Sequence, residues 1–242
     1  MNWAIGDIHG CVHTLRGLID NVLLIDKDAR FIFVGDYVDR GKFSKQVIDY
    51  IIELCDQNRV ESVLCGNHDL VWSYLCGAER PGQSEYTNYN EIVNWWIHNG
   101  LISCLDSYGI PFDRNHPFGL KSTLRYEIPQ SHKDFLLSLQ YFWENDDYFI
   151  SHALKPASFI NGNREINEST ISIMVWDRPN YEYMNTNHEK ICIHGHTPTN
   201  DGWPEKGVRC ILIDTHYRNR ITAYCLDTKE FIFQETDNKD IT

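Results

Sequence analysis

Apolar and polar positions in the first part of the chain repeat as a short apolar run followed by a helical pattern. Residues 3–5, 31–35 and 62–65 are apolar runs rich in β-branched and aromatic side chains, which predicts three buried strands. Between them, apolar residues recur at helical spacing over 15–23 and 47–55, and Ser44 is a candidate N-cap for the second helix. Crossovers of this kind place parallel strands side by side, with their carboxyl ends at one edge.

The remainder of the chain mixes helical and strand patterns. Helices are predicted from residue 70, over 92–105 and over 169–176. A further helix is predicted after Ser131, which is its candidate N-cap, with Phe142 on its buried side. Strands are predicted over 148–150, 190–193, 210–214, 221–226 and 231–234. Two polar segments, 77–90 and 109–122 (which contains His116), are predicted to be irregular and to wall a substrate cleft.

The order of these elements predicts an α/β fold. The first half alternates strand and helix while the second half is rich in strands, which favours two sheets packed together. No internal repeat, low-complexity tract or linker interrupts residues 1–242. We therefore expect one domain.

Composition narrows the class of protein. With 42% hydrophobic and 13% aromatic residues the chain has ample material for a core. A net charge of −12 disfavours non-specific binding to nucleic acid or to an anionic membrane. The eight cysteines form no CxxC pair, and neither a leader pattern nor a membrane-length apolar run is present. These features predict a soluble, cytoplasmic protein with reduced thiols.

Polar side chains follow the predicted strands where each strand ends. They are Asp7, His9, Asp36, Asn67, His152 and His196. Carboxylate, imidazole and amide oxygen are the ligands expected of manganese, iron or zinc, and paired metals are a standard device for hydrolysing phosphate esters. Taken singly, His152 is more simply a core histidine, and Asp36 to Arg40 a surface loop with a structural ion pair. Six such residues at successive strand ends favour a metal site.

The motifs that carry these residues are GDIHG (6–10), GDYVDRG (35–41), GNHD (66–69), SHA (151–153) and GHTP (195–198). Together, in this order, they resemble the metallophosphoesterases of the PPP serine/threonine phosphatase type, most closely the small bacterial and phage members. The resemblance implies a four-layer αββα sandwich of two mixed sheets flanked by helices. It also implies a dinuclear site for two divalent ions, commonly manganese, with iron or zinc as alternatives.

The resemblance implies a role for each motif residue. One metal would take Asp7, His9 and Asp36, and the other would take Asp36, Asn67, His152 and His196. His68 would be the general acid, oriented by Asp39. Arg40, Asn67 and Arg178 would hold the phosphate, although the motif around Arg178 is weak. A hydroxide that bridges the two metals would attack phosphorus directly, without a covalent enzyme intermediate.

Some positions depart from the family pattern or need interpretation. Asp69 stands where many members have Glu, in what we expect to be a supporting position. His194 is interpreted as a neighbour of the site rather than a ligand. Pro198 replaces the second histidine of the nuclease-like relatives, which disfavours that branch. Trp95 and Trp96 are expected to pack in the core rather than to form a stacking platform.

Three functions compete. The leading one is a protein serine/threonine phosphatase, with a phosphorylated protein, peptide or small molecule as substrate and with possible dual specificity. The alternative is a dinucleoside polyphosphate hydrolase, such as one acting on diadenosine tetraphosphate. The remote alternative is a non-catalytic scaffold that kept the fold, which the full set of motif residues disfavours.

Overall fold

The first sheet holds the strands that carry the earliest motifs. The computed structural model describes residues 1–83, 86, 88–113, 119–159, 161–215 and 219–241. The sheet has the order β10-β9-β1-β2-β3. Its strands are Asn2–Ile5 (β1), Arg30–Phe33 (β2), Val60–Val63 (β3), Arg220–Cys225 (β9) and Phe231–Glu235 (β10). Strands β1, β2 and β3 are parallel, while β9 runs antiparallel to both of its neighbours.

The second sheet holds the strands of the later motifs, in the order β4-β5-β6-β8-β7. Its strands are Phe142–Glu144 (β4), Tyr148–Ser151 (β5), Ile191–His194 (β6), Glu205–Lys206 (β7) and Cys210–Leu212 (β8). Strands β5, β6 and β8 are parallel, and the edge strands β4 and β7 are antiparallel to their neighbours. Both sheets are therefore mixed.

The two sheets pack face to face through an apolar layer. Ala4 and Ile32 of the first sheet share a buried cluster with Ile150, Ile193 and Ile211 of the second. Because side chains alternate along a strand, the neighbouring residues in the first sheet point to its outer face. There they join the larger core with helices Val12–Ile25 (α1) and Ser44–Asp56 (α2).

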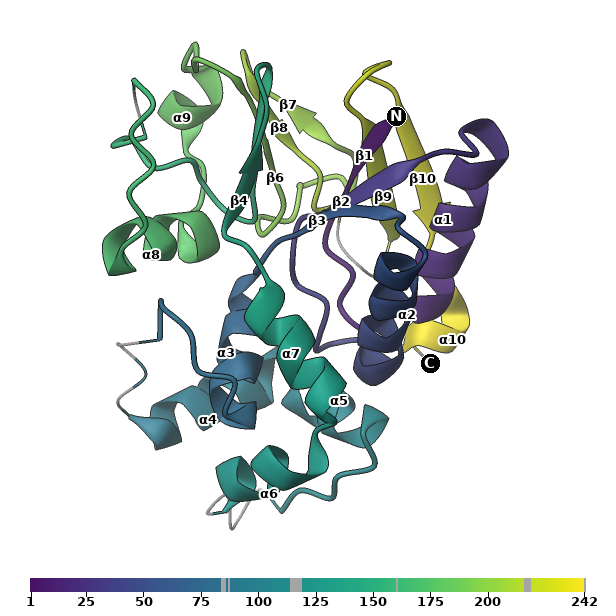
Figure 1. The fold of residues 1–242 in the computed structure, drawn as a ribbon, viewed down its shortest axis with the longest axis vertical. Helices are drawn as coiled ribbons and strands as arrows, with labels where there is room; N and C mark the ends of the chain where they lie inside the picture. Colours follow the sequence, from purple (N-terminus) through teal and green to yellow (C-terminus); the bar gives the residue numbers. More distant parts are fainter. Residues whose placement is uncertain (84–85, 87, 114–118, 160, 216–218, 242) are drawn as a thin grey trace.

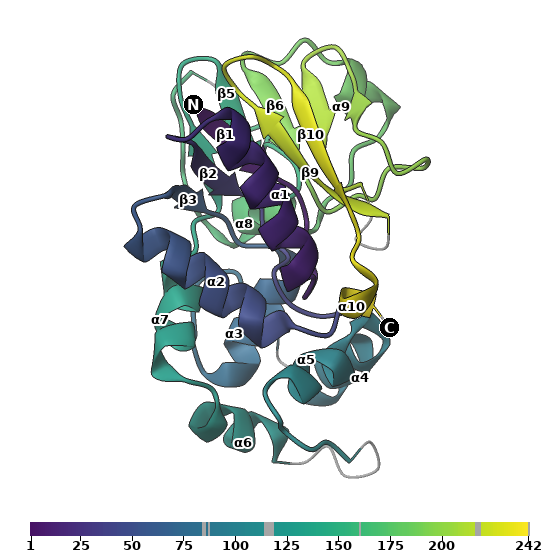
Figure 2. The same ribbon diagram turned by 90° about the vertical axis from the view of Figure 1, so that its right-hand side faces the viewer.

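Helices cover the outer face of each sheet (Figures 1 and 2). Helices α1 and α2 lie on the first sheet, while Glu168–Trp176 (α8) and Tyr181–Asn185 (α9) lie beside the second. Asn238–Ile241 (α10) packs against α1. The predicted fold class, two mixed sheets flanked by helices, is confirmed.

Further helices gather at one end of the sheets (Figures 1 and 2). They are Asn67–Cys76 (α3), Tyr89–Asn99 (α4), Leu101–Ser107 (α5), Leu120–Glu127 (α6) and Gln130–Ser138 (α7). The helix predicted over 92–105 is divided into α4 and α5 at Gly100, whose φ is +114°. A side chain at this glycine would place its Cβ 2.2 Å from the backbone nitrogen of Arg40. The break between α4 and α5 is therefore the point where these helices meet the GDYVDRG loop.

Several local predictions were wrong. Ser44 is the first residue of α2 rather than its cap, and its hydroxyl accepts the Asp39 N–H at 2.9 Å. Pro129, not Ser131, precedes α7, and Phe142 belongs to β4 rather than to the helix. Helix α6 begins inside the segment predicted to be irregular. His116 lies outside the described residues.

Two global features bear on the class of protein. Within the described part of the chain, no helix is long and apolar enough to cross a membrane. All eight cysteines are free thiols, and Cys55 alone among them is exposed.

Candidate metal centre and phosphate pocket

The loops after β1 and β2 are hydrogen-bonded to each other. The N–H groups of Ile8 and His9 both donate to the Asp36 carbonyl, at 3.1 and 2.8 Å. Close approach at two other loops requires glycine: a Cβ at Gly66 would lie 2.1 Å from an Asp36 carboxylate oxygen, and one at Gly195 would lie 2.0 Å from Asp7. The strand-end loops of both sheets therefore converge on Asp36 and Asp7.

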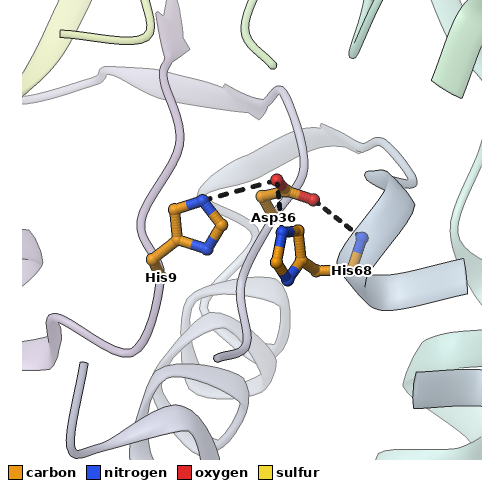
Figure 3. Close-up of side chains that lie close together, drawn as sticks. All are labelled: His9, Asp36 and His68. Carbon is orange, nitrogen blue, oxygen red and sulfur yellow. Dashed lines mark hydrogen bonds and ion pairs between the residues drawn. The ribbon is translucent and has the colours of Figure 1, made fainter. Parts of the chain in front are cut away.

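The first group of possible ligands surrounds one oxygen of Asp36 (Figure 3). Asp36 Oδ2 lies 3.4 Å from His9 Nε2 and 3.9 Å from His68 Nε2. The backbone N–H of His68 donates to the other carboxylate oxygen, Asp36 Oδ1, at 3.1 Å. All three side chains are almost completely buried.

The second group lies on the Oδ1 side of Asp36. His152 Nε2 is 3.4 Å from Asp36 Oδ1 and 3.2 Å from Asn67 Oδ1, and His196 Nδ1 is 3.0 Å from the same Asn67 oxygen. Asp36, His152 and His196 form one of the two buried groups of possible metal ligands found among the described residues, and His9, Asp36 and His68 form the other. Asp36 belongs to both groups.

The hydrogen bonds of the imidazoles test whether this site fits a cation. His9 Nδ1, His152 Nδ1 and His196 Nε2 each face a backbone carbonyl, at 3.0, 3.1 and 3.0 Å. Each of these nitrogens donates its proton to that carbonyl, so the opposite nitrogen presents a lone pair toward Asp36 or Asn67. Lone pairs of nitrogen and oxygen that face one another at 3.0–3.4 Å repel, and a cation between them removes the repulsion.

The protonation states agree with this arrangement. Burial lowers the pKa of His9 and of His152, and it lowers the pKa of His196 to about 3. These imidazoles are therefore neutral, which is the form that ligates metals. The donor set of neutral imidazoles, carboxylate and amide oxygen fits a divalent transition metal.

Asp7 lies in the site but outside both ligand groups. Its two carboxylate oxygens accept the backbone N–H of His196 at 3.2 and 3.1 Å. Burial raises the pKa of Asp7, and the nearby carboxylates of Asp214 and Asp36 raise it further. Asp214 follows β8 and is itself buried, and the sequence analysis assigned it no role.

Asp69 has a supporting position, as expected, because it holds the loops after β2 and β3 by hydrogen bonds. Its carboxylate accepts the backbone N–H groups of Asp36, Tyr37 and Gly66 at 2.7, 2.9 and 2.9 Å. Three N–H groups that would otherwise be buried without acceptors are thereby satisfied. Burial raises the pKa of Asp69 to about 7.

His68 belongs to a second hydrogen-bonded unit. Its Nδ1 donates to Asp39 Oδ2 at 2.6 Å, and its Nε2 lies 3.3 Å from Arg40 Nη2. Burial alone would lower the pKa of His68, but the carboxylates of Asp36 and Asp39 outweigh that effect and raise it. His68 is therefore the imidazole in the site best suited to carry a proton.

The His68 ring opens into a cavity of about 250 Å³. The cavity is lined by Arg40, Asn67, His68, Trp95, Asn99, Trp176, Arg178 and His196. Two arginines at one small pocket suit an anion, and the predicted phosphate residues Arg40, Asn67 and Arg178 all line it. No described residue of 77–90 or 109–122 lines this cavity, and residues 84–85, 87 and 114–118 of these segments lie outside the described part of the chain, so their place beside a substrate cleft stays a prediction.

Aromatic residues of the site were missed or placed elsewhere by the sequence analysis. Trp95 is partly buried and packs against the core, as predicted, but it also lines the cavity, with its ring centroid 5.4 Å from that of His68. Trp96 is fully buried, as predicted, yet its indole N–H donates to Asp39 Oδ2. Trp176 also lines the cavity. Their helical spacing is that of ordinary packing residues, and no sequence signal distinguishes them.

His194 is a neighbour of the site, as interpreted. Its Nε2 lies 2.9 Å from the Tyr183 hydroxyl and its Nδ1 lies 3.2 Å from the Ser151 carbonyl, so both nitrogens are engaged away from Asp36. Burial lowers its pKa to about 3. It belongs to neither ligand group among the described residues.

Comparisons with known proteins agree with the geometry. A symmetrical bis(5'-nucleosyl)-tetraphosphatase from Janthinobacterium is 29% identical over 114 residues, which covers 44% of this chain and 40% of that protein. The catalytic subunit of serine/threonine-protein phosphatase 4 from Eremothecium gossypii is 28% identical over 190 residues, which covers 67% of this chain and 56% of that protein. These matches therefore span between two fifths and just over half of the relatives' own lengths.

The fold matches solved structures over nearly the whole chain. A crystal structure described as a candidate diadenosine tetraphosphatase superposes with a TM-score of 0.64, at 17% identity, over 98% of this chain and 94% of that one. Residues 3–200 match the family model for calcineurin-like phosphoesterases. The chain therefore belongs to the calcineurin-like phosphoesterase family.

Proposed function

We propose that this protein is a metal-dependent phosphoesterase that hydrolyses phosphomonoesters, with phosphoserine and phosphothreonine in proteins as its substrates. The observation that carries the proposal is the His68–Asp39 pair, with an Nδ1 to Oδ2 distance of 2.6 Å, beside a cavity lined by two arginines. A serine or threonine alkoxide is a poor leaving group. Its departure needs a proton, and a buried, carboxylate-bound imidazole can donate one.

Two divalent ions complete the proposed site. His9 and Asp36, with Asp7, would hold one ion, and Asp36, Asn67, His152 and His196 would hold the other. When bound, such ions lower the pKa of water and neutralise phosphoryl charge. Manganese is the ion we favour, since mixed imidazole, amide and carboxylate ligands suit it, and iron or zinc suit the same set.

The chain's own residues would divide the remaining work. Arg40 and Arg178 would hold the phosphoryl oxygens, since a planar guanidinium matches them in a bidentate manner. The oxygen of a water molecule forms the new bond to phosphorus as the ester bond breaks, and His68 Nε2 gives its proton to the departing serine oxygen. One proton of the attacking water is released, and a proton from solvent restores the protonated His68. Asp39 keeps the His68 ring oriented.

A second candidate substrate class is the dinucleoside polyphosphates. Trp95 and Trp176 both line the cavity, and their ring centroids lie 5.5 Å apart. Aromatic side chains beside a phosphate pocket can stack a nucleobase. The similarity to bis(5'-nucleosyl)-tetraphosphatases supports this candidate about as well as the similarity to protein phosphatase 4 supports the first.

The deciding experiment measures turnover of phosphoserine, phosphothreonine and phosphotyrosine peptides beside diadenosine tetraphosphate, at one saturating manganese concentration. We expect the highest kcat/KM on a phosphoserine or phosphothreonine peptide. A higher kcat/KM on diadenosine tetraphosphate would replace the first candidate with the second. No turnover of any substrate, with metal bound, would favour a scaffold.

A further inference from the structure

The buried contact between Trp96 and Asp39 links the helical end of the molecule to the proton donor. We propose that Trp96 is a positioning residue, which acts through Asp39 to orient the His68 imidazole. This inference rests on the roles proposed above for His68 and Asp39. It assigns a part of the reaction to α4, a helix that supplies no candidate metal ligand.

The two hydrogen bonds meet on a single oxygen. The Trp96 indole N–H donates to Asp39 Oδ2, and His68 Nδ1 donates to the same oxygen at 2.6 Å. Asp39 and Trp96 are both completely buried. Because water cannot replace the indole at this place, Trp96 is one of the contacts that fix the rotation of the carboxylate about its χ2 angle.

The rest of α4 surrounds the same catalytic unit. The Trp95 ring packs on the His68 ring at a centroid distance of 5.4 Å, and Asn99 lines the cavity. Gly100, directly after the helix, leaves no room for a side chain: a Cβ there would lie 2.2 Å from the Arg40 backbone nitrogen and 3.0 Å from the Asp39 Cβ. One end of α4 thus contacts the imidazole, its carboxylate and the neighbouring arginine.

Orientation matters because proton transfer depends on geometry. General acids contribute about 10²–10⁴-fold when the donor lies within hydrogen-bond reach of the leaving atom. If the Asp39 carboxylate rotates, His68 Nδ1 follows it, and Nε2 on the other side of the ring swings away from the leaving oxygen. The loss should be largest for a leaving group that most needs a proton.

The test is Trp96→Phe, which keeps an aromatic ring and removes the N–H. We expect kcat on a phosphoserine peptide to fall about 10–100-fold, the range found for hydrogen-bond partners that orient metal-ligating side chains, with KM little changed. p-Nitrophenyl phosphate, whose leaving group departs almost unaided, should lose far less. An equal loss on both substrates would overturn the inference.

Trp72→Phe is the matched control. Trp72 is also fully buried, and its ring packs against Trp96 at a centroid distance of 5.0 Å, so the same substitution disturbs the same part of the core. It should affect the two substrates equally. A leaving-group preference in Trp72→Phe as large as that in Trp96→Phe would show that core repacking, not the N–H, causes the effect.

A double-mutant cycle separates this inference from the proposed function. If Trp96 acts through Asp39, then Trp96→Phe should cause little further loss of phosphoserine turnover in an Asp39→Asn background. Additive losses would overturn the inference. If Asp39→Asn alone affects both substrates equally, the general-acid proposal itself fails. If Asp39→Asn shows the preference and Trp96→Phe does not, only the role of Trp96 fails.

A spectroscopic measurement serves if Trp96→Phe does not fold. The chain has seven tryptophans, so the indole region of a ¹H–¹⁵N spectrum holds few peaks to assign. A hydrogen bond to a carboxylate moves the Trp96 N–H resonance downfield, and Asp39→Asn should move it back upfield while the Trp72 resonance shifts far less. A Trp96 resonance that does not respond to Asp39→Asn would overturn the inference.

Discussion

Five residues of the site have left-handed backbone conformations, although none of them is glycine. His9, Asp36, Asp39, Arg40 and His196 have φ values of 45°, 53°, 71°, 66° and 62°. Such a conformation costs about 1–3 kcal/mol for each residue and persists where the surroundings fix it. Here the loops are fixed by hydrogen bonds such as those from Ile8 and His9 to the Asp36 carbonyl.

The same conformation occurs outside the site, in a surface turn closed by the backbone hydrogen bond from Lys229 to the Cys225 carbonyl. Lys229 has a φ of 64° and is exposed in the turn between β9 and β10. Lys229→Gly should raise the free energy of unfolding by about 0.5–1 kcal/mol, because glycine adopts a positive φ without steric cost. The gain is smaller than that steric cost, because glycine also gives the unfolded chain more conformational entropy. Urea denaturation measures the change. Thr228→Gly, one residue earlier with negative φ, should destabilise, and stabilisation by both would contradict the backbone argument.

His68 gives the sharpest test among single residues. His68→Asn should depress turnover of a phosphoserine peptide by about 10²–10⁴-fold and that of p-nitrophenyl phosphate much less. Arg40→Ala should instead weaken both substrates similarly, since both present the same phosphoryl oxygens. Metal analysis of purified His68→Asn is the control: loss of bound manganese together with equal slowing of both substrates would make His68 a metal ligand instead.

At the scale of elements, the sequence predicted what is local. The strands with their glycine-bounded loops were found because apolar runs and motif residues are contiguous. Helix α10 and the role of Trp96 were missed, because each depends on a partner distant in the chain. Strand β4 pairs with the adjacent strand β5 and was missed because Phe142 was assigned to the preceding helix. Asp39 and Trp96 are separated by 57 residues, and no pattern of apolar and polar residues indicates that they are in contact.

Helix α10 shows such a distant partnership. The Asp240 carboxylate accepts the N–H groups of His13 and Thr14 at 3.1 and 2.8 Å, so it caps the first turn of α1 from the other end of the sequence. Asp240→Ala should lower the free energy of unfolding by about 1–2 kcal/mol, as loss of an N-cap does. Chemical denaturation checks this. Lys239→Ala, exposed on the same helix, should have little effect, and equal losses would exclude the cap as the cause.

Helix α7 is joined to α2 by a buried histidine. His132 Nε2 donates to Asp49 at 2.8 Å, and its Nδ1 lies 2.9 Å from the Tyr108 hydroxyl. Burial lowers the pKa of His132 below its usual 6.5. As the pH falls below 6.5, the unfolded chain therefore binds a proton at His132 that the folded chain resists, and stability falls.

His132→Gln tests this pH dependence. Its free energy of unfolding should be lower than that of the wild type at pH 7.5, yet should fall by less between pH 7.5 and pH 5.5. Urea denaturation at the two pH values gives the comparison. An equal or larger fall in the variant would mean that His132 does not contribute to the loss of stability in acid.

At the scale of the whole molecule, the candidate ligands come from both sheets. Asp7 and Asp36 follow strands of the first sheet, and His152 and His196 follow strands of the second. Convergence within the first sheet was predictable, because its parallel strands end at a common edge, whereas the joining of His152 and His196 from the second sheet was implied only by the family resemblance. The helices around the cavity were not predictable, because α4 contacts the site only through tertiary packing and carries no motif.

A metal bound between the sheets should stabilise the entire fold. At free manganese 100 times its dissociation constant, one site adds about 2.7 kcal/mol to the free energy of unfolding. For a chain of this size, that gain corresponds to a rise in Tm of roughly 5–10 °C over protein stripped with EDTA. Differential scanning calorimetry with and without manganese measures the shift.

Asp36→Asn is the decisive companion variant. Asp36 belongs to both ligand groups, and its carboxylate is the one negative charge that they share. Asparagine keeps the size of the side chain and removes that charge, so the variant should lose most of the bound metal and most of the manganese-dependent rise in Tm. A full rise in Tm in Asp36→Asn, with normal metal content, would place the stabilising ion elsewhere and rule out Asp36 as the ligand that the two ions share.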